Sequence, residues 1–83
     1  IGPSDLSANM GHIGNPGAPE VVAAVDDALD RIAASDKASG IMALDPAAAK
    51  AYLDRGVDFV AVSIDARTLA LSLRALAAEM RDR

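Results

Sequence analysis

The sequence contains no cysteine and almost no aromatic residues, and both absences narrow the range of possible functions. Without cysteine there are no disulfides, no thiolate metal ligands and no cysteine nucleophile, a composition typical of cytoplasmic proteins. The aromatic residues are Tyr52 and Phe59 alone, too few for a surface that stacks bases or sugars. No apolar run approaches the length of a membrane span, so we expect no membrane partner.

Basic residues are also scarce, with 8 Lys and Arg against 12 Asp and Glu and a net charge of −4. They are scattered rather than clustered, which argues against binding of nucleic acid. At 83 residues the chain makes at most one domain with a marginal core. Because it also opens on what is predicted to be the end of a strand, we expect a C-terminal fragment of a longer protein.

The start of the chain carries the most chemistry. An apolar strand is expected to end at Ile1, because Gly2 and Pro3 interrupt the ladder and leave Ser4 and Asp5 at the strand end. A short carboxylate held there suits a hard cation, and the N–H groups of Ser4 and Asp5 are available to an anion. An aspartate after Gly-Pro is also a common turn former or helix cap. The glycine-rich stretch that follows predicts a long loop that closes over a pocket.

Apolar periodicity divides the rest of the chain into alternating helices and strands. Pro19 and Pro46 suit first helical positions, Asp45 is a predicted N-cap, and Gly56 is expected to end the second helix. The predicted elements are a strand end and active-site loop at 1–17, helices at 19–34, 46–55 and 66–81, and strands at 38–44 and 57–63.

Each predicted helix has an apolar side and a polar side. Asp65 or Thr68 is expected to cap the last helix. The acidic residues at 26, 27 and 30 are interpreted as solvated surface. The side chains expected to face inward are Val21, Val22, Val25, Leu29 and Ile32, then Ala48, Ala49, Tyr52 and Leu53; the last helix carries a stripe of Leu69, Leu73, Leu76, Ala77 and Met80.

Strand and helix therefore alternate, which predicts an α/β fold of successive βα units with parallel strands. Three such units cannot close an eight-stranded barrel, but they fit the last three units of a (β/α)8 TIM barrel. In that fold the carboxyl ends of the strands meet at one mouth. We therefore expect segments 2–7, 42–45 and 63–65 to surround a common site.

An ordered series of short motifs resembles a known enzyme family. The chain is similar to the metal-dependent, class II pyruvate aldolases of the 4-hydroxy-2-oxoheptanedioate aldolase and 2-keto-3-deoxyrhamnonate aldolase type, in the aldolase/citrate lyase superfamily. The motifs are Ile1-Gly-Pro-Ser-Asp-Leu-Ser7, Met10-Gly11, Gly14-Asn15-Pro16, Pro19-Glu20-Val21, Lys37-Ala38, Gly40 and the segments 51–56 and 59–62.

The resemblance implies reversible aldol cleavage of a 2-oxoacid, with pyruvate or hydroxypyruvate as the enolate partner and an aldehyde as the other. It implies that Asp5 is one of two carboxylate ligands to a divalent cation, Mg²⁺, Mn²⁺ or Co²⁺, which polarises the keto oxygen. It implies that the N–H groups of Ser4 and Asp5 bind the substrate carboxylate, that Gly2 and Pro3 shape the turn, and that Met42 lines the pocket near the aldehyde. A plain core position is the alternative for Met42.

In that family the histidine base, the oxyanion-stabilising arginine and the second carboxylate lie outside the matched portion, so no catalytic residue is assigned and the chain alone is expected to be inactive. His12, the only histidine, is expected to be exposed or packed in its loop. Ser63 stands where the family pattern has glycine, and its hydroxyl is expected to narrow the pocket. Arg67 either reaches a substrate carboxylate or is surface charge, which we favour.

Two other functions compete with the aldolase. A citrate lyase-like enzyme that cleaves a coenzyme A thioester would need a basic patch for the nucleotide phosphates, which the sequence does not show. A non-catalytic half-barrel that associates with itself or a complementary fragment is the second alternative. The resemblance also implies a homo-oligomer, a trimer or hexamer, in which the last helix packs between subunits.

Overall fold

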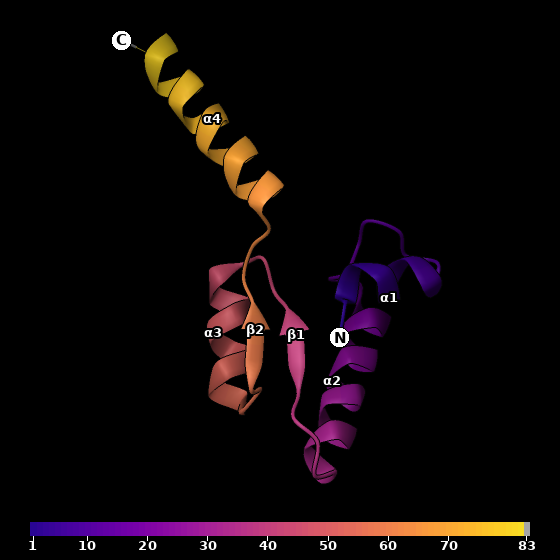
Figure 1. Ribbon diagram of the computed structural model, residues 1–83. Coiled ribbons are helices and arrows are strands. Elements are labelled where there is room, and N and C mark those ends of the chain that lie inside the picture. Colours follow the sequence, from indigo (N-terminus) through magenta and orange to yellow (C-terminus); the bar gives the residue numbers. More distant parts are fainter. Residues whose placement is uncertain (83) are drawn as a thin grey trace.

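The computed structural model describes residues 1–82, and α-helices dominate it (Figure 1). Helices α2 and α3 have the bounds that the sequence predicts. The helices are α1 (Pro3–Asn9), α2 (Pro19–Ala34), α3 (Pro46–Arg55) and α4 (Asp65–Arg81), and the strands are β1 (Gly40–Met42) and β2 (Phe59–Ala61).

Strands β1 and β2 form a parallel two-stranded sheet in which Ile41 lies opposite Val60. The two strands are joined through α3, so this part of the chain is a strand–helix–strand unit and the α/β class is confirmed. Each strand is shorter than the predicted ranges 38–44 and 57–63, because only its central residues pair with the neighbouring strand.

Ile1 lies beside β1 and behaves as the end of a further strand. Its terminal nitrogen donates to the Gly40 carbonyl at 2.7 Å, and its carbonyl accepts from the Met42 N–H at 3.3 Å. Backbone groups of successive strand residues point to opposite edges of a strand. Gly40 and Met42 bond to Ile1 at one edge, whereas the Ala43 N–H donates to the Ala61 carbonyl of β2 at the other, at 2.9 Å. Ile1 therefore occupies the edge of β1 that faces away from β2.

The residues after Ile1 correct the sequence prediction, because Pro3–Asn9 is a helix rather than the start of a long loop. Gly2 has an extended backbone and acts as the N-cap residue, and Pro3 occupies a first-turn position that needs no N–H donor. Asp5 lies in the same first turn, where the helix dipole favours a carboxylate. The Gly-Pro break thus ends a strand and also begins a helix.

The core lies between α2 and one face of the sheet. Val25 and Leu29 of α2 pack with Ile41 and Val57, and Val21 is also fully buried. These are the positions that helical spacing predicts. Two further residues expected to face inward are exposed instead, Val22 by 43% and Leu53 by 52%.

The acidic side of α2 is paired rather than only solvated. Arg55, at the end of α3, donates to the Asp26 carboxylate at 2.6 Å, to the Asp26 carbonyl at 3.0 Å and to the Asp30 carboxylate at 2.7 Å. The hydrogen bond to Asp26 raises the pKa of Arg55 above its ordinary value. Arg55 therefore ties α3 to α2, while Asp27 pairs with Arg31 within α2.

The caps of the last two helices differ in how well sequence predicts them. Asp45 is the N-cap of α3 and accepts from the Ala48 N–H at 3.1 Å, and Gly56 ends that helix in the left-handed conformation, both as predicted. Neither expected cap holds for α4, whose N-cap is Ile64 without a side-chain bond. Thr68 instead exchanges a hydrogen bond with Ser63.

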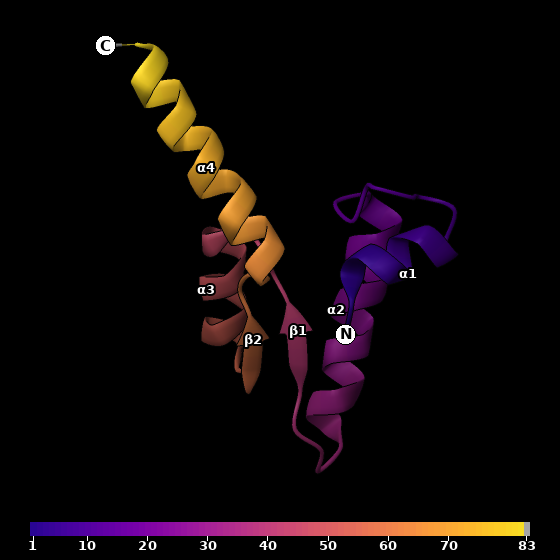
Figure 2. The same cartoon turned by 45° about the horizontal axis from the view of Figure 1, so that its top comes forward.

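Helix α4 extends away from the rest of the molecule in both views (Figures 1 and 2). None of its residues is buried. Its extension gives the molecule its elongated shape, with principal extents of 54 × 28 × 18 Å. Within residues 1–82, no helix combines the length and apolar character needed to cross a bilayer.

Candidate active site

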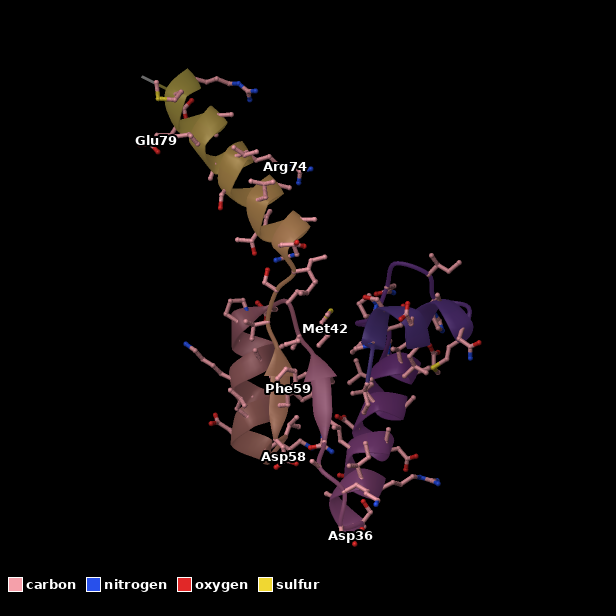
Figure 3. All side chains as sticks on the ribbon, viewed as in Figure 1. Asp36, Met42, Asp58, Phe59, Arg74 and Glu79 are labelled. Carbon is pink, nitrogen blue, oxygen red and sulfur yellow. The ribbon has the colours of Figure 1, made fainter. Side chains whose placement is uncertain are left out.

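A cavity of about 700 Å³ opens where α1 begins and where β1 leads into α3. All of the residues predicted to bind substrate or metal line it: Gly2, Pro3, Ser4, Asp5 and Met42. Met42 is the last residue of β1 (Figure 3), and its N–H donates to the Ile1 carbonyl at 3.3 Å. The structure thus brings together two segments that lie about forty positions apart in the sequence.

The first wall of the cavity is the opening turn of α1. Ser4 and Asp5 are exposed, and both lie ahead of Leu6, whose N–H is the first to bond back along the chain, to Gly2 at 3.0 Å. The N–H groups of a first helical turn have no partner within the helix. Those of Ser4 and Asp5 therefore have no partner within the helix, and both residues line the cavity.

The second wall is formed by the segment from Met42 to Asp45 and by Ala48 and Tyr52 of α3. Ile41 and Ala43 are buried toward the helices, whereas Met42 is partly exposed, so the strand alternates as predicted. Met42 belongs to the cavity and not to the core. This favours the pocket interpretation of Met42 over the plain core position.

The third wall is the loop between α1 and α2, which contributes Pro16 and Gly17. His12 holds this loop in place: its N–H donates to the Ser7 carbonyl at 2.7 Å, and its Nε2 lies 2.8 Å from Glu20. His12 does not line the cavity, in keeping with the loop-packing role expected for it.

Other residues expected at the mouth lie elsewhere. The segment 63–65 does not line the cavity, so Ser63 does not narrow it in this structure. Ser63 instead hydrogen-bonds Thr68 at 2.6 Å at the start of α4. Arg67 is exposed on α4, away from the cavity-lining residues. These residues follow β2 into a helix that leaves the body of the molecule, which explains their absence from the site.

Asp5 has the chemistry of one ligand to a hard cation. Its carboxylate takes part in no side-chain hydrogen bond or ion pair between described residues, and carboxylate oxygens are ligands that Mg²⁺ and Mn²⁺ prefer. Residues 1–82 contain no cluster of three or more acidic or histidine side chains that would hold a metal ion. Asp5 therefore fits a site to which other residues must also contribute.

Two residues of the cavity, Tyr52 and Val22, were expected from the sequence to be core positions. Asp45 was expected both to cap the helix at 46–55 and, within segment 42–45, to lie at the mouth of the site. It does both, because it caps α3 and also lines the cavity. The signal for its second position is that it directly follows the predicted strand, where parallel strands place their functional groups.

The family profile described as HpcH/HpaI aldolase/citrate lyase matches residues 1–71. A hydroxypyruvate/pyruvate aldolase of Pseudomonas aeruginosa is 53% identical over 81 residues, covering 98% of this chain and 30% of that protein. A 4-hydroxy-2-oxo-heptane-1,7-dioate aldolase of Klebsiella pneumoniae is 53% identical over 78 residues, covering 94% of this chain and 29% of that protein.

A crystal structure gives a similar result. An HpcH/HpaI aldolase/citrate lyase family protein from Burkholderia cenocepacia J2315 superposes with a TM-score of 0.88 at 36% sequence identity. The superposition covers 98% of this chain and 32% of that protein. The chain thus spans about a third of the length of the proteins that it matches.

Proposed function

Because the chain belongs to the HpcH/HpaI aldolase/citrate lyase family, we propose that it forms part of a carbon–carbon lyase that reversibly joins a 2-oxoacid to an aldehyde. One observation carries the proposal: within the segment that the family profile matches, every residue predicted to bind substrate lines the same cavity. The names of the similar proteins, pyruvate and hydroxypyruvate aldolases among them, support the same reaction class.

The proposed architecture is the C-terminal part of a TIM barrel, with residues 1–83 supplying its last three βα units. The order of neighbours supports it, because Ile1 lies beside β1 and β1 pairs with β2, as three adjacent strands of a barrel would. The cavity lies at the carboxyl ends of Ile1 and β1, where TIM-barrel enzymes hold their active sites. The remaining strands would come from the rest of the full-length enzyme.

The residues of α1 take the substrate's carboxylate in this proposal. The N–H groups of Ser4 and Asp5 donate to it from the first helical turn, while Gly2 and Pro3 fix the direction of that turn. The Asp5 carboxylate is the ligand for a divalent cation, Mg²⁺, Mn²⁺ or Co²⁺. Such a cation supplies Lewis-acid polarisation of the keto oxygen. Met42, with Tyr52 beside it in the lining, forms the part of the cavity that takes the aldehyde in this proposal.

The general base, the arginine and the second carboxylate ligand belong to the rest of the enzyme, so the 83-residue chain alone is inactive. No Lys or Arg side chain within residues 1–82 lines the cavity, and this supports an aldolase over an enzyme that must bind the phosphates of coenzyme A. A cytoplasmic location stays a prediction from the sequence.

The proposed assembly is a homo-oligomer, a trimer or hexamer, in which α4 packs on a neighbouring subunit. Its support is the apolar stripe of α4, which finds no cover within the described part of the chain. Soluble proteins rarely leave such a large apolar face in water.

Asp5→Ala tests the reaction and the role of Asp5 together. In a full-length enzyme that contains this chain, the substitution should abolish metal-dependent exchange of the pyruvate methyl protons, which NMR follows in deuterated buffer. The fold should persist, because Asp5 is exposed and packs against little. Asp36→Ala, which removes an exposed carboxylate outside the cavity, is the matched control. Near-normal exchange in Asp5→Ala would remove Asp5 from the site.

A further inference from the structure

The side chains that this chain contributes to the cavity carry only negative charge. Asp5 and Asp45 are the charged side chains among the lining residues of the described chain, and the remainder are apolar or small, apart from Ser4 and Tyr52. Asp5 is committed to the cation in the proposed function. Asp45 is therefore an additional carboxylate in the cavity, and the proposed function assigns it no role toward the substrate.

Basic residues on the elements around the cavity include His12 in the loop after α1 and Lys50 and Arg55 on α3; Lys50 is exposed and does not line the cavity. His12 is bound to Glu20 at 2.8 Å, and Arg55 is bound to Asp26 and Asp30 at the other end of α3. Arg55 lines a separate cavity of about 180 Å³ and not the larger one. None of these three side chains lines the cavity that contains Asp45.

Asp45 is held in a fixed position by the start of α3. Its Oδ2 accepts the Ala48 N–H at 3.1 Å, and Pro46 restricts the following backbone. Its other oxygen, Oδ1, accepts no hydrogen bond from the residues that the structure describes. That oxygen is available to a hydroxyl donor on a molecule in the cavity.

The name of one kind of similar protein, 4-hydroxy-2-oxo-heptane-1,7-dioate aldolase, fixes the charge of the aldehyde that this kind of protein releases. Retro-aldol cleavage of a 4-hydroxy-2-oxo acid breaks the C3–C4 bond. The C4 hydroxyl loses its proton and becomes the aldehyde carbonyl, and the bonding electrons pass to C3 of the pyruvate enolate, which then takes up a proton. With heptane-1,7-dioate as the carbon skeleton, the released aldehyde keeps a carboxylate. A carboxylate on the aldehyde would meet Asp45 as a like charge.

We infer that the aldehyde accepted in this cavity is an uncharged hydroxyaldehyde, and that Asp45 is the residue that disfavours an aldehyde bearing a carboxylate. The inference rests on the proposed aldolase function. It assigns Asp45 two tasks that use different oxygens: Oδ2 caps α3, and Oδ1 accepts a hydrogen bond from a hydroxyl group of the aldehyde.

Asp45→Asn in the full-length enzyme isolates the charge, because asparagine is an equally good N-cap. The measurement is kcat/KM for addition of pyruvate to glycolaldehyde and to succinic semialdehyde. At an effective dielectric constant of about 20, two unit charges about 10 Å apart change an equilibrium by roughly tenfold. The preference for glycolaldehyde over succinic semialdehyde should therefore fall about tenfold, as expected from the same estimate.

Two further variants make the test specific. Asp45→Ser, another uncharged N-cap, should shift the preference in the same direction. Asp36→Asn removes the same charge beyond the opposite end of the sheet from Met42 and should leave the preference unchanged (Figure 3).

The outcomes separate this inference from the proposed function. An enzyme that exchanges pyruvate protons but favours succinic semialdehyde, or whose preference is the same in Asp45→Asn and wild type, overturns the inference alone. An enzyme that neither exchanges pyruvate protons nor adds pyruvate to either aldehyde overturns both.

Discussion

Helices α2 and α4 have similar lengths, 16 and 17 residues, and both carry an apolar stripe, yet they bury it very differently. α2 buries Val21, Val25 and Leu29, whereas Leu69 and Leu76 of α4 are 61% and 55% exposed. Apolar periodicity therefore predicts that each segment is an amphipathic helix, but it does not identify the surface that covers the stripe.

The difference follows from what each helix meets in the chain. The stripe of α2 faces Ile41 of β1 and Val57, which supply apolar side chains at the matching level. α4 begins four residues after the end of β2 and extends away from the sheet (Figure 1). Most helical stability in proteins comes from packing of the apolar face, so α4 requires a partner that the first 61 residues do not provide.

The largest effect is expected from breaking the stripe of α4. Leu73→Asp combined with Leu76→Asp in the full-length enzyme should split or weaken the proposed oligomer, because burial of each leucine is worth about 1.5–3 kcal/mol. Sedimentation velocity measures the result. Ala78→Asp, on the opposite side of the helix, is the control and should leave the assembly intact. An unchanged, fully folded assembly of the double variant would mean that the stripe is not an intersubunit contact.

An intermediate effect is expected in the packed part. Leu29→Ala should lower the free energy of unfolding by about 2–5 kcal/mol, because it leaves a cavity among Val25, Ile41 and Val57. Denaturant unfolding at two protein concentrations measures it. This loss should be the same at both concentrations, whereas the loss in Leu76→Ala should depend on concentration. The same dependence in both variants would contradict the contrast between α2 and α4.

The smallest effect is expected at His12. It lies near the cavity but pairs with Glu20, so His12→Ala should leave the exchange of pyruvate methyl protons largely unchanged. Removal of a general base typically costs about 10²–10⁴-fold in rate. A fall of that size, measured by NMR beside a Glu20→Gln control, would make His12 the base and move the catalytic centre into this chain.

The candidate site was predictable where its residues belong to a short motif. Gly2, Pro3, Ser4 and Asp5 were identified from one stretch of sequence, and all four line the cavity. Their conformation was predicted wrongly, because Gly-Pro ends a strand and begins a helix equally well and only the contacts around it decide. Asp45 was identified as a helix cap and, within segment 42–45, as part of the mouth of the site, whereas Tyr52 and Val22 were taken for core residues, since the segments that they face across the cavity are distant in sequence.

The sequence by itself determined the bounds of α2 and α3, the parallel strand–helix–strand unit and the family. Pro19, Pro46, Asp45 and Gly56 act within one helical turn, and apolar periodicity acts within one helix, so local reading is sufficient for them. Only the tertiary structure decided three other features: the cavity, the clamp of Arg55 on α2 and the exposure of α4. Arg55 bonds to Asp30 and Asp26, which precede it in the sequence by 25 and 29 positions. Such contacts depend on the packing of whole elements, which no local pattern specifies.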